Sequence, residues 1–97
     1  MLEILASAGI GTAAARLAPV LARPDGEELV RLTALWFDHA RRWDAAATAA
    51  GLHRYSLRAR VERLAAELAL EMDAFADRAD LWALVSLHVD RMSRHQS

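Results

Sequence analysis

The sequence predicts an all-α domain, a small bundle of about five helices that contains a helix-turn-helix. Alanine and leucine supply 37 of the 97 residues, whereas valine, isoleucine and threonine together supply 10. This composition favours helices over a β-sandwich or barrel. The length suggests one domain with a modest core and no deep enclosed pocket. Apolar residues at helical spacing then divide the chain into five segments.

The first segment is apolar and is expected to be helical over residues 2–22. Gly9, Gly11 and Thr12 weaken the helical pattern near its middle, so we expect two short helices there. We expect Pro24 to end the segment, because proline lacks a backbone N–H and disfavours helical backbone in the residue before it.

A second helix is expected to begin after Asp25. This aspartate is an N-cap candidate, and Glu28 follows three residues later as in a capping box. The helical pattern fades at residues 39–42. We therefore divide the chain into an N-terminal apolar helical segment, residues 1–24, and a helix-turn-helix domain, residues 25–94.

The third and fourth segments form the predicted helix-turn-helix. A short, alanine-rich helix over 44–50 has Asp44 as its expected N-cap, and Gly51 is expected to stop it with a positive φ. A longer helix over 54–68 follows. Its apolar residues recur at i, i+4, i+7 and i+11 and form one stripe: Leu57, Val61, Leu64 and Leu68.

The fifth helix is expected over residues 77–92. Asp77 and Asp80 resemble an N-cap with an acidic first turn. The apolar face of this helix is broad, and we expect it to close the bundle.

Positive charge is concentrated in the middle of the chain. The net charge is −1, yet residues 41–63 carry six of the twelve arginines and only two acids. The island holds Arg41, Arg42, Arg54, Arg58, Arg60 and Arg63. A basic island in an acidic domain indicates a polyanionic partner, and the alternative is an ordinary solvated helix face.

The stripe on the 54–68 helix decides which side chains can reach DNA. With that stripe facing the core, Tyr55, Ala59, Glu62 and Arg63 point away from it, and Arg58 and Arg60 lie on the flanks. A recognition helix offers its N-terminal residues to base edges. The candidate base readers are Arg54, Tyr55, Arg58 and Ala59. The candidate phosphate contacts are Arg41, Arg42, His53, Ser56, Arg60 and Arg63.

Three residues of the 54–68 helix have alternative interpretations. Glu62 is either a reader of cytosine or the i,i+4 ion-pair partner of Arg58, and we favour the ion pair. Arg60 could instead pack its stem on the core and pair with an acid. Tyr55 could be a partly buried anchor at the start of the helix.

Residues 53–64, HRYSLRARVERL, resemble the helix-turn-helix signature at the C-terminus of PucR-type (purine catabolism regulator-like) bacterial transcriptional regulators, which reads about H-R-N-T-L-R-Y-R-L-x-R-I. The resemblance covers about residues 25–92. It implies DNA binding by a domain at the end of a longer protein whose upstream part senses a signal. Tyr55 replaces the usual Asn, Ser56 the usual Thr and Ala59 the usual Tyr. Ser56 can still cap the helix or touch phosphate, whereas the changes at Tyr55 and Ala59 fall on the outward face and put in doubt which bases are read.

Other classes of function have little support in the sequence. The chain has no cysteine, and its four histidines lack the spacing of a metal site, so we expect no metal, no cofactor and no enzymatic activity. No stretch reaches the length of a membrane span. We expect a cytoplasmic protein that binds double-stranded DNA as a homodimer or higher oligomer. The alternative is a helical interaction module whose face at residues 41–63 binds an acidic partner.

Overall fold

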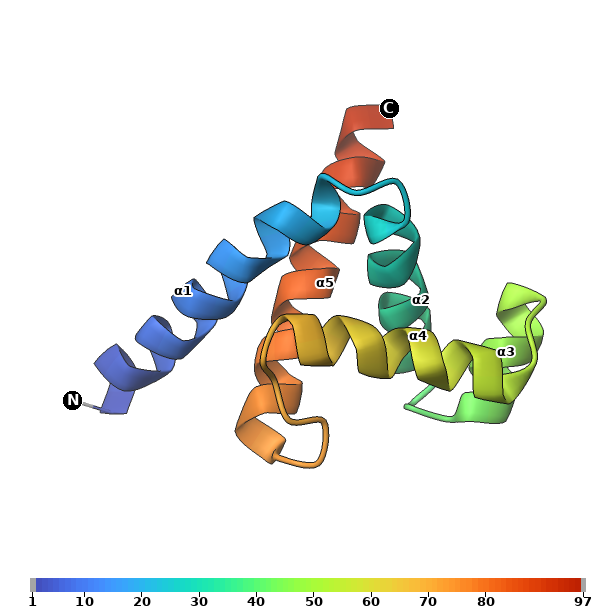
Figure 1. The fold of residues 1–97 in the computed structure, drawn as a ribbon, viewed down its shortest axis with the longest axis horizontal. Helices are drawn as coiled ribbons and strands as arrows, with labels where there is room; N and C mark the ends of the chain where they lie inside the picture. The colour runs from blue at the N-terminus through green and yellow to red at the C-terminus, as the bar shows by residue number, and fades with distance from the viewer. Residues whose placement is uncertain (1, 97) are drawn as a thin grey trace.

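A computed structural model describes the backbone of residues 2–96 and the side chains of residues 11–92. Within that part of the chain the structure consists of five helices and no strands. The helices are α1 (Leu2–Leu21), α2 (Gly26–Asp38), α3 (Trp43–Ala50), α4 (Arg54–Glu67) and α5 (Phe75–Gln96). The predicted all-α class is confirmed. Helix α4 crosses in front of α2 and α5 (Figure 1).

The core consists of two clusters of buried apolar side chains. The larger cluster joins α1, α2, α4 and α5 through Ala13, Leu17, Val20, Leu29, Val30, Ala34, Leu64, Ala65, Leu68, Leu81, Leu84 and Val85. The smaller cluster joins α2, α3 and α4 through Leu32, Trp36, Ala46, Ala47, Leu57 and Val61. The predicted stripe of α4 is fully buried at all four positions and contributes to both clusters. Because burial of apolar surface dominates folding, this stripe fixes the rotation of α4 about its axis.

Helix α1 is one continuous helix, so the predicted break at Gly9, Gly11 and Thr12 is wrong. Glycine and threonine lower helix propensity by a fraction of a kcal/mol to about 1 kcal/mol each, but they keep the backbone N–H that the helix needs. The alanines that follow favour continuation. Pro19 also lies inside α1, and the helix ends before Pro24. The N-terminal end of α1 projects away from the other helices (Figure 1).

Asp25 is the N-cap residue of α2, as predicted, but its side chain makes no cap hydrogen bond. The predicted aspartate caps of the next short helix and of the last helix are wrong. Helix α3 begins at Trp43, which places Asp44 inside its first turn. Helix α5 begins at Phe75, two residues before Asp77, whose carboxylate accepts a hydrogen bond from the N–H of Glu71 at 2.8 Å. The carboxylates of Asp25, Asp44 and Asp77 are therefore engaged in tertiary or loop contacts and not in capping hydrogen bonds.

An ion-pair network joins the α1–α2 turn to the end of α4. Arg23 donates through both Nη groups to the carboxylate of Glu67 and also lies 3.5 Å from Asp25. The hydrogen bond from Arg23 lowers the pKa of Glu67, and the same bond raises the pKa of Arg23. Arg16 of α1 donates to the carbonyl of Leu68 at 3.3 Å. These contacts fasten α1 to the C-terminal end of α4.

Candidate nucleic-acid interface

Helices α3 and α4 are joined by a tight turn at Gly51, as predicted. Gly51 has φ 71° and ψ 30°, in the left-handed region. The N–H of Leu52 then donates to the carbonyl of Ala47 at 2.9 Å, which satisfies a carbonyl at the end of α3. Leu57 is fully buried where the two helices meet. The small buried side chains of Ala46 and Ala47 allow α3 to lie close to its neighbours.

The start of α4 is organised by His53. The Nδ1 atom of His53 accepts a hydrogen bond from the N–H of Tyr55 at 3.3 Å, so His53 is the N-cap. The two rings stack with centroids 5.2 Å apart. Tyr55 is 63% exposed, so the alternative of a partly buried anchor is wrong. The cap leaves an exposed phenol at the first turn of α4.

Arg54 is held by one partner from α3 and one from its own helix. Its Nη1 lies 3.5 Å from Oδ1 of Asp44 on α3, and its Nη2 donates to the hydroxyl of Tyr55 at 3.1 Å. Its guanidinium carbon also lies 4.9 Å from the centroid of the Tyr55 ring. The role of Asp44 as a partner of Arg54 was missed by the sequence analysis, because a contact across ten residues leaves no local pattern.

Arg58 lies one turn further along α4. Its Nε donates to Oε1 of Glu62 at 3.2 Å, which confirms the favoured ion pair. Its guanidinium carbon lies 5.8 Å from the centroid of Trp43. Trp43 in turn stacks on the buried Trp36, with centroids 4.5 Å apart and planes inclined by 17°. The guanidinium of Arg58 thus packs over Trp43, which in turn stacks on Trp36 of the core.

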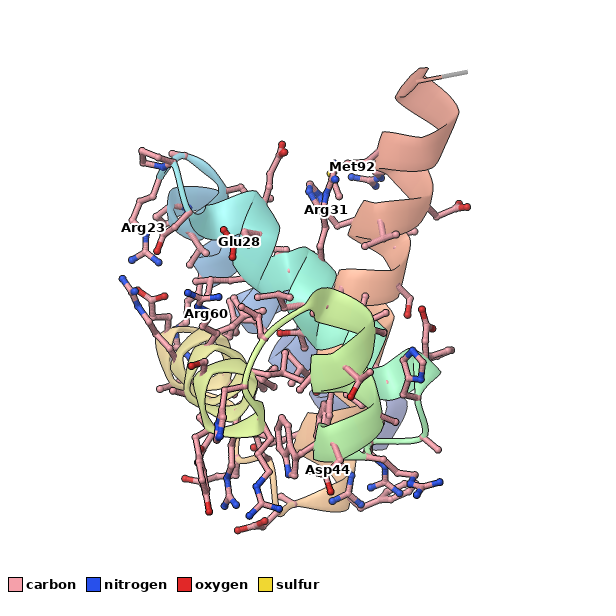
Figure 2. All side chains as sticks on the ribbon, turned by 90° about the vertical axis from the view of Figure 1, so that its right-hand side faces the viewer. Arg23, Glu28, Arg31, Asp44, Arg60 and Met92 are labelled. Atoms are coloured by element: carbon pink, nitrogen blue, oxygen red, sulfur yellow. The ribbon has the colours of Figure 1, made fainter. Side chains whose placement is uncertain are left out.

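These side chains line a surface hollow of about 430 Å³. Its lining consists of Arg41, Arg42, Trp43, Asp44, Arg54, Tyr55 and Arg58. Four guanidinium groups therefore share the hollow with one carboxylate. Arg41 and Arg42 make no side-chain ion pair within the described part of the chain, so both have free donors. Figure 2 views this side of the molecule, with Asp44 at its lower edge among several nitrogen-bearing side chains.

The turn that carries Arg41 has an unusual backbone. Ala40 and Arg41 have φ values of 55° and 61°, both in the left-handed region. The N–H of Arg41 donates to the carbonyl of Trp36 at 2.8 Å, which closes the C-terminal end of α2. Two consecutive left-handed residues other than glycine are costly. The packing of α2 and α3 holds them, and this places Arg41 at the hollow.

Arg60 and Arg63 lie on the opposite flank of α4. Arg60 pairs with Glu28 of α2 at 3.3 Å, which confirms the acid pairing in the alternative interpretation of Arg60. Arg63 lies 3.3 Å from Asp25 and 4.0 Å from Glu67. Figure 2 shows Arg60 and Glu28 close together on the side away from Asp44. Arg60 and Arg63 therefore lie apart from the four arginines that line the hollow.

The remaining candidates follow the helical projection. Ser56 and Ala59 are both exposed on α4. Beside the first hollow lies a second one, of about 440 Å³, which shares Arg41, Trp43 and Arg58 with it. Three acids also line this second hollow: Glu62, Glu71 and Asp73. The positive surface is thus bounded on this side by carboxylates.

The described residues offer no sign of two other kinds of site. No group of three or more potential ligands from histidine, cysteine, aspartate or glutamate lies close enough to hold a metal ion among them. No helix in the described part of the chain has both the length and the apolar character to span a bilayer.

A short helix, a tight glycine turn and a second helix with exposed arginines at its start define a helix-turn-helix domain of the DNA-binding kind. The family model of the PucR C-terminal helix-turn-helix domain matches residues 29–87, and the chain belongs to this family. This confirms the resemblance carried by residues 53–64. The family indicates DNA binding in transcriptional regulators. Neither the curated proteins nor the solved structures gave a match.

Proposed function

We propose that the chain binds double-stranded DNA sequence-specifically, with α4 in the major groove, as the C-terminal domain of a bacterial transcriptional regulator. The observation that carries this proposal is the hollow at the start of α4, where four arginines and the exposed Tyr55 come together. Arginine matches both phosphate oxygens and the major-groove edge of guanine. Membership in the family supports DNA as the polyanion that binds to this surface.

The proposed contacts divide by position. Base edges would be read from the first two turns of α4, by Arg54, Tyr55, Arg58 and Ala59. Phosphates would be contacted by Arg41, Arg42, His53, Ser56, Arg60 and Arg63. Arg60 and Arg63 must each leave a carboxylate to reach DNA. We therefore expect them to contribute less than Arg41 and Arg42, whose donors are free.

We propose further that DNA is bound by a homodimer or higher oligomer, because one recognition helix reads few base pairs. Exposed apolar side chains on α5, Phe75, Trp82 and Leu87, support a self-association surface there. The full-length protein would add an upstream sensory domain. DNA as the partner favours the cytoplasm as its compartment.

The test is a titration of the chain onto a random-sequence duplex pool at several salt concentrations, read by fluorescence anisotropy. Each neutralised phosphate adds about 0.9 to the slope of log K against log salt. The double substitution Arg41→Ala with Arg42→Ala should therefore reduce that slope by about 1.8. Arg31→Ala is the matched control, because Arg31 is exposed on α2 and donates to the Sδ atom of Met92, and it does not line the hollow.

The same titration with a tethered dimer controls for weak binding by an isolated copy. Binding with a steep salt slope that the double substitution reduces would support the proposal. Binding with no salt slope, or an equal effect of Arg31→Ala, would contradict it. A chain that fails to bind DNA but binds an acidic protein surface through the same arginines would favour the interaction-module alternative.

A further inference from the structure

Arg58 and Arg54 differ in which of their nitrogen atoms are already engaged. Arg58 uses Nε for Glu62, and its two Nη groups make no hydrogen bond within the described part of the chain. Arg54 has both Nη groups engaged, one with Asp44 and one with Tyr55. Arg58 therefore keeps all four N–H donors of its two Nη groups for a ligand, whereas Arg54 keeps two of its four.

The guanidinium of Arg58 is also held in place by contacts with Trp43 and Glu62. Its guanidinium lies over Trp43, and the Trp43 ring stacks on Trp36, which is 4% exposed. A guanidinium over an indole face is attracted by the ring quadrupole. Glu62 holds one edge of the group from the next turn of the same helix. One contact at the face and one at the edge of the guanidinium restrict the rotation of a long side chain that is 56% exposed.

We propose that Arg58 is the residue that reads guanine, and that Glu62 and Trp43 are its positioning residues. This inference rests on the proposed DNA-binding function. Guanine offers two acceptors, N7 and O6, on its major-groove edge, and a guanidinium fork with two free N–H groups donates to both at once. An arginine whose Nε edge is already occupied keeps the pair of terminal N–H groups that this contact uses.

Glu62 has a second effect on the same surface. Its side chain is 51% exposed, and it brings a negative charge next to the fork. A carboxylate at this position repels phosphate oxygens, so it disfavours a contact between Arg58 and the DNA backbone. Because specificity is a difference of affinities, such repulsion raises the preference for the base edge. Glu62 therefore both orients Arg58 and lowers binding to random sequence.

The experiment is binding-site selection from a random duplex pool by the tethered dimer, followed by titrations onto the selected site and onto copies with each guanine replaced by adenine. The variants are Arg58→Ala, Glu62→Ala and Glu62→Gln. Glu27→Gln is the matched control, because Glu27 is an exposed acid at the far end of α2 with the same charge. Circular dichroism of each variant verifies that the helices are retained.

The guanine preference is the ratio of affinities for the guanine and adenine versions of one position. Arg58→Ala should abolish a preference of roughly five- to 150-fold at a single position. Glu62→Ala should lower that preference about two- to tenfold and raise affinity for random DNA. Glu62→Gln, which keeps the acceptor without the charge, should raise affinity for random DNA but retain most of the preference.

An equal loss of affinity for both versions in Arg58→Ala would assign Arg58 to phosphate and overturn the inference while leaving the proposed function intact. An unchanged guanine preference in Glu62→Ala would overturn the positioning role of Glu62. Absence of DNA binding by the unsubstituted dimer would instead refute the proposed function itself.

Discussion

Replacement of Gly51, in the turn between α3 and α4, should lower the free energy of unfolding by an amount that follows from the backbone geometry of this residue. Gly51 has φ 71°, and a Cβ atom built there meets no atom within 4 Å. Gly51→Ala therefore introduces no clash, and its cost is the left-handed backbone conformation, about 1–2 kcal/mol. The loss of unfolded-chain entropy offsets about 0.4–1 kcal/mol of this. We expect the free energy of unfolding to fall by about 1 kcal/mol.

The assay is reversible unfolding in urea and by heat, followed by far-ultraviolet circular dichroism. A loss of 1 kcal/mol in a domain of this size corresponds to a melting temperature about 4–8 °C lower. Gly51→Asn is the matched variant, since asparagine tolerates the left-handed conformation better than alanine does, and it should be the less costly of the two. An alanine variant as stable as the unsubstituted chain, or less stable than expected by several kcal/mol, would show that the left-handed backbone does not set the cost of this substitution.

Three further predictions concern the packing at Gly26, the pH dependence of the Glu67 contact, and the difference between Arg63 and Arg41 in DNA binding. Gly26→Ala should destabilise the domain more than Gly51→Ala does, by about 2 kcal/mol or more in the same assay, because its Cβ would lie 1.9 Å from a backbone oxygen of α1. Glu67 has a lowered pKa, so its stabilising contact is present above the ordinary glutamate value of 4.5 and is lost as pH falls through the lower folded value. The difference in stability between the unsubstituted chain and Glu67→Gln should therefore shrink on acidification below pH 4.5, and a constant difference would contradict this. Arg63→Ala should weaken DNA binding less than Arg41→Ala, and the reverse order in salt titrations would contradict the proposed division.

The helices could be predicted from the sequence because their signal is local. The stripe from Leu57 to Leu68 is a periodic pattern within one segment, and burial of that stripe is the largest energy term that acts on α4. The turn at Gly51 was predictable for the same reason, since few other residues adopt a left-handed conformation at low cost. The continuity of α1 was not predictable from propensities alone, because the penalties of two glycines and a threonine are small compared with helix cooperativity.

The partners of the charged residues were less predictable, since they depend on distant segments. Asp25 and Asp44 each stand where a helix cap would be expected, yet each lies near an arginine from another element. A short carboxylate can accept from backbone N–H groups or from a guanidinium, and only the tertiary structure decides between them. The contact between Asp25 and Arg63 spans 38 positions of the chain and leaves no local trace.

The four arginines of α4 lie on two different flanks of the helix for a simple geometric reason. At about 100° per residue, Arg54 and Arg58 lie about 40° apart around α4, and Arg60 and Arg63 lie about 60° apart. The two pairs fall on opposite sides of the buried stripe, so one pair faces α3 and the other faces the acidic start of α2. A count of charges along the sequence could not distinguish these flanks, because the count ignores where α2 and α3 pack.

Nuclear magnetic resonance would locate the DNA-contacting surface of the chain most directly, through backbone amide shifts during titration with the selected duplex. We expect the shifts to be concentrated at residues 41–44 and 53–59, apart from any at the proposed self-association surface on α5. Shifts at Arg60 and Arg63 without shifts at the residues that line the hollow would contradict the proposed interface.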